Sequence, residues 1–334
     1  MTTKTDKTKN EYILKAKQLM IRAYKEALEK THQFSEDKNT VVLDYKDKSN
    51  IGLGIHYTAV WAVKNWAITL YHSSWKYYRS AIIYYAELEH EKGSLNIKQL
   101  DKIKELLRRT KGHSDKDIAK TSHSKKKSLN LKELKSIDNK LKDSKSRWAK
   151  PTRIFIRAGK YTGLRPIEWQ RAEINIEKKL LRVFNAKSTN GRSLGETRTL
   201  SLKHLDDKQI KDIENHILLV KNIISKNAWD QYYNGCSSLL KRITRKLWPN
   251  KKKYPTLYSC RHQFSADMKA SGCTKREVAA LMGHANDLTA QEHYGRKLFG
   301  TRGRKPIVNS VDLQRVKETN KNNKFKLGNN KKDS

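Results

Sequence analysis

Cysteine, proline and long apolar stretches are all scarce in this sequence, which has three cysteines and five prolines in 334 residues. Cys236, Cys260 and Cys273 form no C-x-x-C pair, which argues against a disulfide framework and a structural zinc site. No run of about 18 apolar residues exists to span a membrane. The first residues, MTTKTDKTKN, lack the apolar stretch of a signal peptide. We therefore expect a reduced, cytoplasmic, largely helical protein without a membrane partner.

Acidic residues are few beside basic ones. Lysine and arginine total 72 against 34 for aspartate and glutamate, which gives a formal net charge of +38. A soluble surface does not need such an excess, so the charge indicates a polyanionic partner, most commonly nucleic acid. Hydrophobic residues make up 36% of the chain, enough for packed cores. At this length we expect two domains with tails.

The chain divides by composition into five predicted segments. The stretch TKGHSDKDIAKTSHSKKK is almost free of apolar residues and is typical of a linker. It separates a helical first domain from a larger second one. The predicted boundaries are 1–10 for a disordered N-terminus, 11–109 for a helical first domain, 110–127 for the basic linker, 128–299 for the second domain and 300–334 for a basic tail.

The first domain shows helical spacing of apolar residues over 11–30, 55–71 and 74–92. It is also dense in tryptophan and tyrosine, including Trp61 and Trp75. Aromatic rings beside basic residues could stack on bases, but these rings follow the helical period. We therefore interpret them as core.

In the second domain the spacing of apolar residues changes from helical to strand-like and then becomes helical again. Helices are predicted near 129–143 and 149–161, and the stretches 180–186 and 197–202 indicate a β-hairpin with an Asn-Gly turn. Helices are predicted again near 206–226, 235–248 and 257–271, followed by two helices with capping boxes at Thr274 with Glu277 and Thr289 with Glu292. The last box would place Tyr294 in the first turns of a helix that begins near 290. The fold class is therefore mainly α with a small β-hairpin or sheet.

Three segments of the second domain stand out: TGLRPIEW (162–169), LYSCRHQFSADMKASG (257–272) and LMGHANDLTAQEHYGR (281–296). In their order and spacing, with a lysine-bearing hairpin between the first two, they resemble the tyrosine recombinases, the phage integrase family. The resemblance covers about 129–297. It implies a two-domain DNA clamp in which a helical core-binding domain precedes the tyrosine-recombinase catalytic domain.

The resemblance assigns catalytic roles to particular residues. The matches, with the role each implies, are Arg165 and Arg261 as the two arginines, Lys187 as the hairpin lysine, His284 as the histidine after a small residue, and Tyr294 as the nucleophile. Two features depart from the family. Tyr258 stands where the family has a histidine, three residues before Arg261, and the interval from His284 to Tyr294 is one residue longer than expected. We keep Tyr258 as a candidate catalytic residue.

These residue types suit phosphodiester chemistry without a cofactor or a metal. Two fixed guanidiniums can stabilise the negative charge that builds on the non-bridging oxygens, and they remain charged at any physiological pH. A tyrosine with a free pKa of about 10 needs positive surroundings or a base to become a nucleophile. A lysine can protonate the leaving 5′ oxygen. The carboxylates at 206, 207, 212 and 214 could suggest a metal pair, but solvated helix-start carboxylates explain them better.

The function that the resemblance implies is site-specific DNA recombination through a 3′-phosphotyrosyl intermediate, by the integrase of a mobile element or phage. The partners implied are double-stranded DNA, a homo-tetramer formed on DNA and possible accessory DNA-bending proteins. Phosphate contacts are expected from two lysine runs: Lys125, Lys126 and Lys127, and Lys251, Lys252 and Lys253. The alternatives are a non-catalytic DNA-binding protein such as an accessory factor or repressor, a type IB topoisomerase, and a basic RNA-binding protein, for which no RNA-recognition signature is present.

Overall fold

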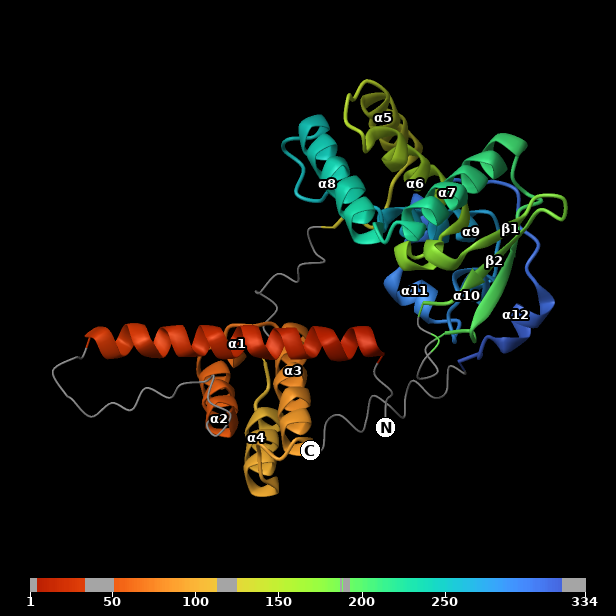
Figure 1. The fold of residues 1–334 in the computed structure, drawn as a ribbon. Coiled ribbons are helices and arrows are strands. Elements are labelled where there is room, and N and C mark those ends of the chain that lie inside the picture. The colour runs from red at the N-terminus through yellow and green to blue at the C-terminus, as the bar shows by residue number, and fades with distance from the viewer. Residues whose placement is uncertain (1–4, 34–50, 113–124, 187, 189–192, 320–334) are drawn as a thin grey trace. The chain divides into compact units, whose positions relative to one another are not determined.

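The computed structural model describes residues 5–33, 51–112, 125–186, 188 and 193–319, and these are mostly helical (Figure 1). The chain separates into two compact units, Met1–Lys120 and Thr121–Ser334. The division falls inside the basic segment that the sequence predicts as a linker. The described part holds one small antiparallel sheet, so the predicted fold class, mainly α with a small sheet, is confirmed. No described helix is long and apolar enough to cross a bilayer.

The first unit is helical throughout its described residues. Its elements are α1 (Asp6–Gln33), α2 (Ile51–Ala62), a π-helical turn η2 (Val63–Ala67), α3 (His72–Glu91) and α4 (Ile97–Arg109). The helix α1 begins earlier than predicted, so residues 6–10 are helical rather than disordered. The helix predicted over 55–71 instead begins at 51 and ends in the π-helical turn.

The interpretation of the aromatics as core is confirmed for three rings of this unit. Trp61, Trp75 and Tyr85 are buried in its apolar core. The polar edges of the two tryptophans are satisfied, because Trp61 donates to Glu26 at 2.8 Å and Trp75 donates to the carbonyl of Thr110 at 2.9 Å. These rings therefore pack within the protein and are not free to stack on bases.

One helix of the first unit was not predicted from the sequence. Helix α4 opens with a capping box in which Asn96 and Gln99 exchange side-chain to backbone hydrogen bonds. Leu100, Ile103 and Leu107 follow at helical spacing and are buried. Both signals are local, so this helix could have been found in the sequence.

The second unit packs its helices and its small sheet around the larger core. Its elements are α5 (Leu131–Lys142), α6 (Ala149–Thr162), a 3-10 turn η4 (Pro166–Arg171), β1 (Glu173–Asn175), β2 (Leu180–Phe184), β3 (Thr197–Ser201), α7 (Asp207–Ser225), α8 (Trp229–Leu247), α9 (Ser259–Ala270), α10 (Lys275–Met282), α11 (Thr289–His293), a 3-10 turn η6 (Lys297–Phe299) and α12 (Ser310–Arg315). Helix α8 begins at Trp229, earlier than the predicted 235.

The sheet has the order β1-β2-β3, with both pairs antiparallel. The predicted hairpin strands are β2 and β3, in a register that pairs Leu181 with Leu200 and Val183 with Arg198. The Asn-Gly turn between them lies outside the described residues. Arg198 and Leu200 share the buried face of β3. A charged side chain therefore occupies a position where strand alternation would place an apolar one.

The helix ends near the predicted nucleophile differ from the prediction. The capping box of Thr274 and Glu277 is confirmed at the start of α10. The box of Thr289 and Glu292 is wrong, because Thr289 is already helical and its backbone N–H donates to the side chain of Asn286. Helix α11 has only five residues and ends at His293, so Tyr294 lies just after this helix and not within it.

The residues after Tyr294 do not form a loose tail as far as they are described. Val308 bridges to Leu200 of β3, and Asp312 accepts a hydrogen bond of 2.8 Å from the Thr199 backbone N–H. The segment around Lys317 pairs with 285–287, where its N–H donates to the carbonyl of Ala285 at 2.9 Å. The chain from 305 to 319 therefore packs on its own unit, along β3 and α10.

Two glycines of this unit offer a test of how tightly α6 packs against α9. Gly163 ends α6 at φ +64°, and a Cβ added there would lie 2.3 Å from the Phe264 ring. Gly272 has φ +89° with nothing within 4 Å of an added Cβ. We expect Gly272→Ala to cost about 1–2 kcal/mol of unfolding free energy, because an alanine is strained at positive φ. Gly163→Ala should cost roughly 1–3 kcal/mol more through overpacking. Denaturant unfolding of both variants measures the difference, and equal costs would show that the Phe264 ring moves aside freely.

Candidate active site

Five of the six predicted catalytic residues lie together in the second unit. Arg165 precedes η4, Tyr258 and Arg261 lie at the start of α9, His284 follows α10 and Tyr294 follows α11. The sixth, Lys187, lies outside the described residues. The five come from segments far apart in the sequence, so only the fold brings them together.

The hydroxyl of Tyr294 is held by two neighbours. The Tyr258 hydroxyl lies 2.8 Å away, and Arg261 donates from Nε at 3.3 Å. The Arg261 guanidinium carbon lies 5.3 Å from the centre of the Tyr294 ring, and the His284 ring lies 5.0 Å from that ring on centres. A positive charge and a hydroxyl donor therefore meet at one phenol oxygen.

Arg261 is fixed by the ends of two helices. Its side chain is fully buried, with Nη1 donating to the carbonyl of Gly163 and Nη2 to that of Met282, both at 2.6 Å. These carbonyls close α6 and α10, where the helix dipole is negative and favours a cation. Nη2 also contacts His284 Nε2 at 3.1 Å. The orientation of the guanidinium, with Nε toward Tyr294, is thus determined by backbone groups.

Glu168 lies at the centre of a buried cluster of arginines. It binds Arg165 at 2.6 Å and Arg198 at 2.9 Å, and Arg261 Nη1 lies 3.7 Å from its carboxylate. Burial raises the pKa of Glu168, but Arg198, Arg261 and Arg165 outweigh it and hold this pKa far below its usual value. One negative charge among three positive ones leaves the cluster net positive. Such a cluster attracts a phosphate.

Sequence reasoning missed Arg198, which is 1% exposed. Besides Glu168 it donates to the carbonyl of Leu281 at 3.1 Å and to the side-chain oxygen of Asn185. Its full burial keeps it from a substrate, so it joins β3 to η4 and to the end of α10. The available signal was a charged residue at the inward position of a predicted strand, since such a residue needs a buried partner.

The two tyrosines of the site differ in acidity. Burial raises the pKa of Tyr294, but Arg261, the hydrogen bond from Tyr258 and Arg165 together bring it below its ordinary value. The pKa of Tyr258 is raised to about 12 by burial and by Tyr294, against the opposite effect of Arg261 and Arg165. Of the two hydroxyls, Tyr258 therefore holds its proton more tightly, and we assign it as the hydrogen-bond donor to the oxygen of Tyr294. This difference favours Tyr294 as the nucleophile.

His284 is a neutral imidazole in this site. Burial, followed by Arg261, Arg165 and Arg198, lowers its pKa to about 2, while Glu168 acts in the opposite direction. Because Nε2 accepts from Arg261, Nδ1 carries the proton, and Nδ1 is buried without a partner among the described residues. The preceding residue, Gly283, has φ +66°, and an added Cβ would lie 2.5 Å from the Asn185 side chain. A small residue before the histidine is therefore a packing requirement.

A second histidine of the site, His262, was not predicted. Its ring lies 5.0 Å from that of Tyr294 and 5.4 Å from that of Tyr258. Burial, with Lys127, Arg261 and Lys269, lowers its pKa to about 4, so it is neutral at pH 7. The signal was its spacing from Tyr258. His262 lies four residues later, and residues four apart on a helix share a face.

The two predicted DNA-binding lysine runs lie close to each other. Lys126 and Lys251 both bind Glu133, the latter at 2.9 Å, and the Lys126 backbone N–H donates to the carbonyl of Tyr254. These two lysines are thus engaged within the protein. The remaining lysines of the runs are exposed: Lys125, Lys127, Lys252 and Lys253.

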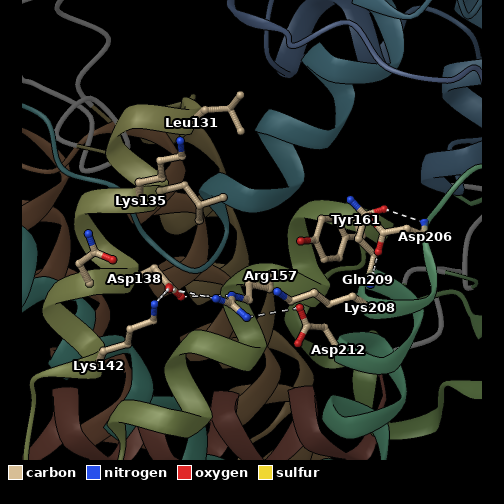
Figure 2. A pocket seen from close by; sticks show the side chains of 12 residues that line it. Leu131, Lys135, Asp138, Lys142, Arg157, Tyr161, Asp206, Lys208, Gln209 and Asp212 are labelled. Carbon is tan, nitrogen blue, oxygen red and sulfur yellow. Dashed lines mark hydrogen bonds and ion pairs between the residues drawn. The ribbon is translucent and has the colours of Figure 1, made fainter.

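The carboxylates considered as a metal pair have other partners. Asp206 caps α7 by accepting from the Gln209 N–H at 2.8 Å, and Asp212 lies 3.6 Å from Arg157 in a pocket between α5, α6 and α7 (Figure 2). Asp207 pairs with Lys179 at 2.9 Å, and the side chain of Glu214 pairs with Lys211 at 2.7 Å. Within the described ranges, no group of three or more histidine, cysteine, aspartate or glutamate side chains could hold a metal ion.

Comparison with known proteins found likeness in structure only. No family model matches the chain, and no curated protein sequence does. Among solved structures, the Tn1549 transposon integrase in complex with a circular intermediate DNA covers 83% of this chain and 95% of its own, at 11% identity and a TM-score of 0.42. The XerH site-specific recombinase bound to a palindromic difH substrate covers 84% and 73%, at 14% identity and a TM-score of 0.41. The XerA recombinase covers 98% and 99%, at 15% identity and a TM-score of 0.35.

These neighbours are of the class that the sequence motifs resemble.

The charge of Glu168 can be tested through stability. The folded-state pKa of Glu168 is depressed, so its contribution to stability is complete above the unfolded-state value of about 4.3 and is lost as pH falls toward the folded-state value. Glu168→Gln leaves three buried arginines without their counter-charge and should cost about 3–5 kcal/mol at pH 7. The deficit should shrink below about pH 4, where the wild type itself weakens.

Thermal or denaturant unfolding at several pH values measures both effects. The matched control is Glu173→Gln, at an exposed carboxylate 3.6 Å from Arg182, and it should change stability by no more than about 0.5 kcal/mol. A loss for Glu168→Gln that stays the same from pH 7 to pH 3 would mean that the charge of Glu168 is not what stabilises the cluster.

Proposed function

We propose that this protein is a site-specific DNA recombinase that cuts and rejoins DNA through a 3′-phosphotyrosyl intermediate on Tyr294. The observation that carries the proposal is the environment of the Tyr294 hydroxyl, which is hydrogen-bonded to Tyr258 and Arg261 beside a buried, net positive arginine cluster. A phenol of lowered pKa next to fixed guanidiniums is suited to attack a phosphodiester.

Arg165 and Arg261 have distinct parts in this reaction. Arg165 gives Glu168 a hydrogen bond from Nη1 only, which leaves Nε and Nη2 without a protein acceptor among the described residues. These donors suit a non-bridging phosphate oxygen. Arg261, oriented by two helix-end carbonyls, supplies a permanent positive charge next to the attacking oxygen. Because both are fixed before DNA binds, little reorganisation is needed in the transition state.

The bond changes balance without a metal or a nucleotide. The Tyr294 oxygen forms a bond to phosphorus while the bond from phosphorus to the 5′ oxygen breaks, and the proton of Tyr294 passes to solvent water. The leaving 5′ oxygen takes a proton, for which we propose Lys187 on the basis of the motif resemblance alone. Tyr258 stabilises the developing phenolate by donating to it. Attack by a free 5′ hydroxyl on the phosphotyrosine reverses these steps and rejoins the strand.

The alternative functions differ from a recombinase in what they require of this site. A non-catalytic DNA-binding protein needs basic surface, but it does not need a half-buried pair of hydrogen-bonded tyrosines in which the pKa of one phenol is lowered. A type IB topoisomerase would use the same chemistry without strand exchange. The origin in a mobile element or phage, the tetramer on DNA and the accessory DNA-bending proteins stay predictions.

Tyr294→Phe should abolish the covalent complex and keep DNA binding, because it removes only the attacking oxygen. Tyr258→Phe should slow formation of the complex by roughly 10- to 100-fold, since a hydrogen bond to a charged group is worth about 1.5–3 kcal/mol. The measurement is the rate of detergent-resistant adduct formation on labelled, nicked DNA in excess EDTA. Tyr57→Phe, at an exposed tyrosine of the first unit, is the control and should react like the wild type.

Three results would contradict the proposal in different ways. An adduct with the Tyr294→Phe variant places the nucleophile elsewhere. Tight DNA binding by the wild type without any adduct supports the non-catalytic alternative. Relaxation of supercoiled DNA without exchange of strands between two duplexes supports the topoisomerase.

A further inference from the structure

The backbone position of Tyr294 is not determined by a helix of its own. Helix α11 ends one residue earlier, and Tyr294 has an extended backbone with φ −118° and ψ 173°. A residue in this conformation has no hydrogen-bonded turn to fix its place. Its position must come from contacts with other segments, and the location of its hydroxyl follows from them.

Those contacts come mainly from α9. The ammonium group of Lys269, in the last turn of that helix, donates to the carbonyl of Ala290 at 2.7 Å and to the carbonyl of Gly295 at 2.8 Å. One acceptor lies within α11 and the other directly follows Tyr294. The two hydrogen bonds thus hold the chain on both sides of the nucleophile. Lys269 is half-buried, and burial lowers its pKa.

Close packing continues this attachment along α9. An added Cβ at Gly295 would lie 2.4 Å from the carbonyl oxygen of His262, and one at Gly300 would lie 2.1 Å from that of Ala266. The buried side chain of Gln263 donates to the carbonyl of Phe299 at 2.9 Å. The segment from 290 to 300 therefore lies directly against the helix that also carries Tyr258 and Arg261.

We propose that Lys269 is a positioning residue for the nucleophile, which sets the place of the Tyr294 hydroxyl by holding the backbone carbonyls on either side of it. Lys269 acts through the peptide chain and touches no reacting atom. Arg261 lies eight residues earlier on the same helix, so one rigid element fixes both the backbone of the nucleophile and the cation at its oxygen. The inference rests on the proposed function, since it concerns the reaction of Tyr294.

Lys269→Met tests this role, because it removes both hydrogen bonds and keeps a long unbranched side chain. We expect the single-turnover rate constant of adduct formation at saturating protein to fall roughly 30- to 100-fold, as misplacement of a reacting group by about 1 Å can cost 10²-fold. DNA affinity, measured in the Tyr294→Phe background, should change less than about twofold, because one lysine is a minor part of the basic surface.

Three companion variants separate positioning from general damage. Lys275→Met makes the same chemical change at an exposed lysine of α10 and should react like the wild type. Lys269→Arg keeps the charge and the donors, so it should recover part of the lost rate. Lys269→Gln keeps a polar group of similar length and should be slow. If the methionine variant does not fold, the rate constant of the glutamine variant tests the positioning role instead.

The rate constant and the amplitude of the reaction distinguish the outcomes. Misfolding lowers the fraction of protein that reacts and leaves the rate constant of the rest unchanged, so that result would overturn the inference in favour of a purely structural role. An unchanged rate constant and amplitude in both the methionine and the glutamine variants would also overturn it. If the wild type itself forms no adduct, the proposed function fails, which is a separate result from any change at Lys269.

Discussion

The buried ion cluster of Glu168 with three arginines is the interaction on which the rest of the second unit depends. Arg165, Arg198 and Arg261 come from three different segments, and each has its charge near one carboxylate. Without Glu168 their mutual repulsion in a buried space would oppose folding. With it, the cluster is stable and still carries excess positive charge. The same balance of charges therefore stabilises the fold of the unit and leaves the positive charge that the proposed phosphate contact requires.

The second constraint is the use of one helix, α9, as a common support. It carries Tyr258 and Arg261 at its start and Lys269 at its end, while the segment of Tyr294 lies along its length. Helix ends from α6 and α10 add the carbonyls that orient Arg261. A group held by a helix is placed more precisely than one held by a loop. The site can therefore be rigid although Tyr294 itself lies outside any helix.

The sequence predicted what depends on local pattern and motif order. Apolar spacing located most helices, and three short segments pointed to Arg165, Arg261, His284 and Tyr294, which the structure brings together. It could not predict Arg198 as a partner of Glu168, because the pairing joins residues 30 apart across β3 and η4. The backbone of Tyr294 was wrongly predicted to be helical, since an apparent capping box is a local signal and the contacts of Lys269 are tertiary. Helix α4 is different, because its signals were present in the sequence.

The central claim is that Tyr294 becomes covalently attached to DNA. The most direct measurement is to trap the wild-type protein on a nicked duplex in EDTA, digest the complex with protease and nuclease, and identify the nucleotide-bearing peptide by mass spectrometry. The account predicts a 3′-phosphonucleotide on Tyr294, in the peptide that joins α11 to η6. The same modification on Tyr258, or on any other residue, would contradict it.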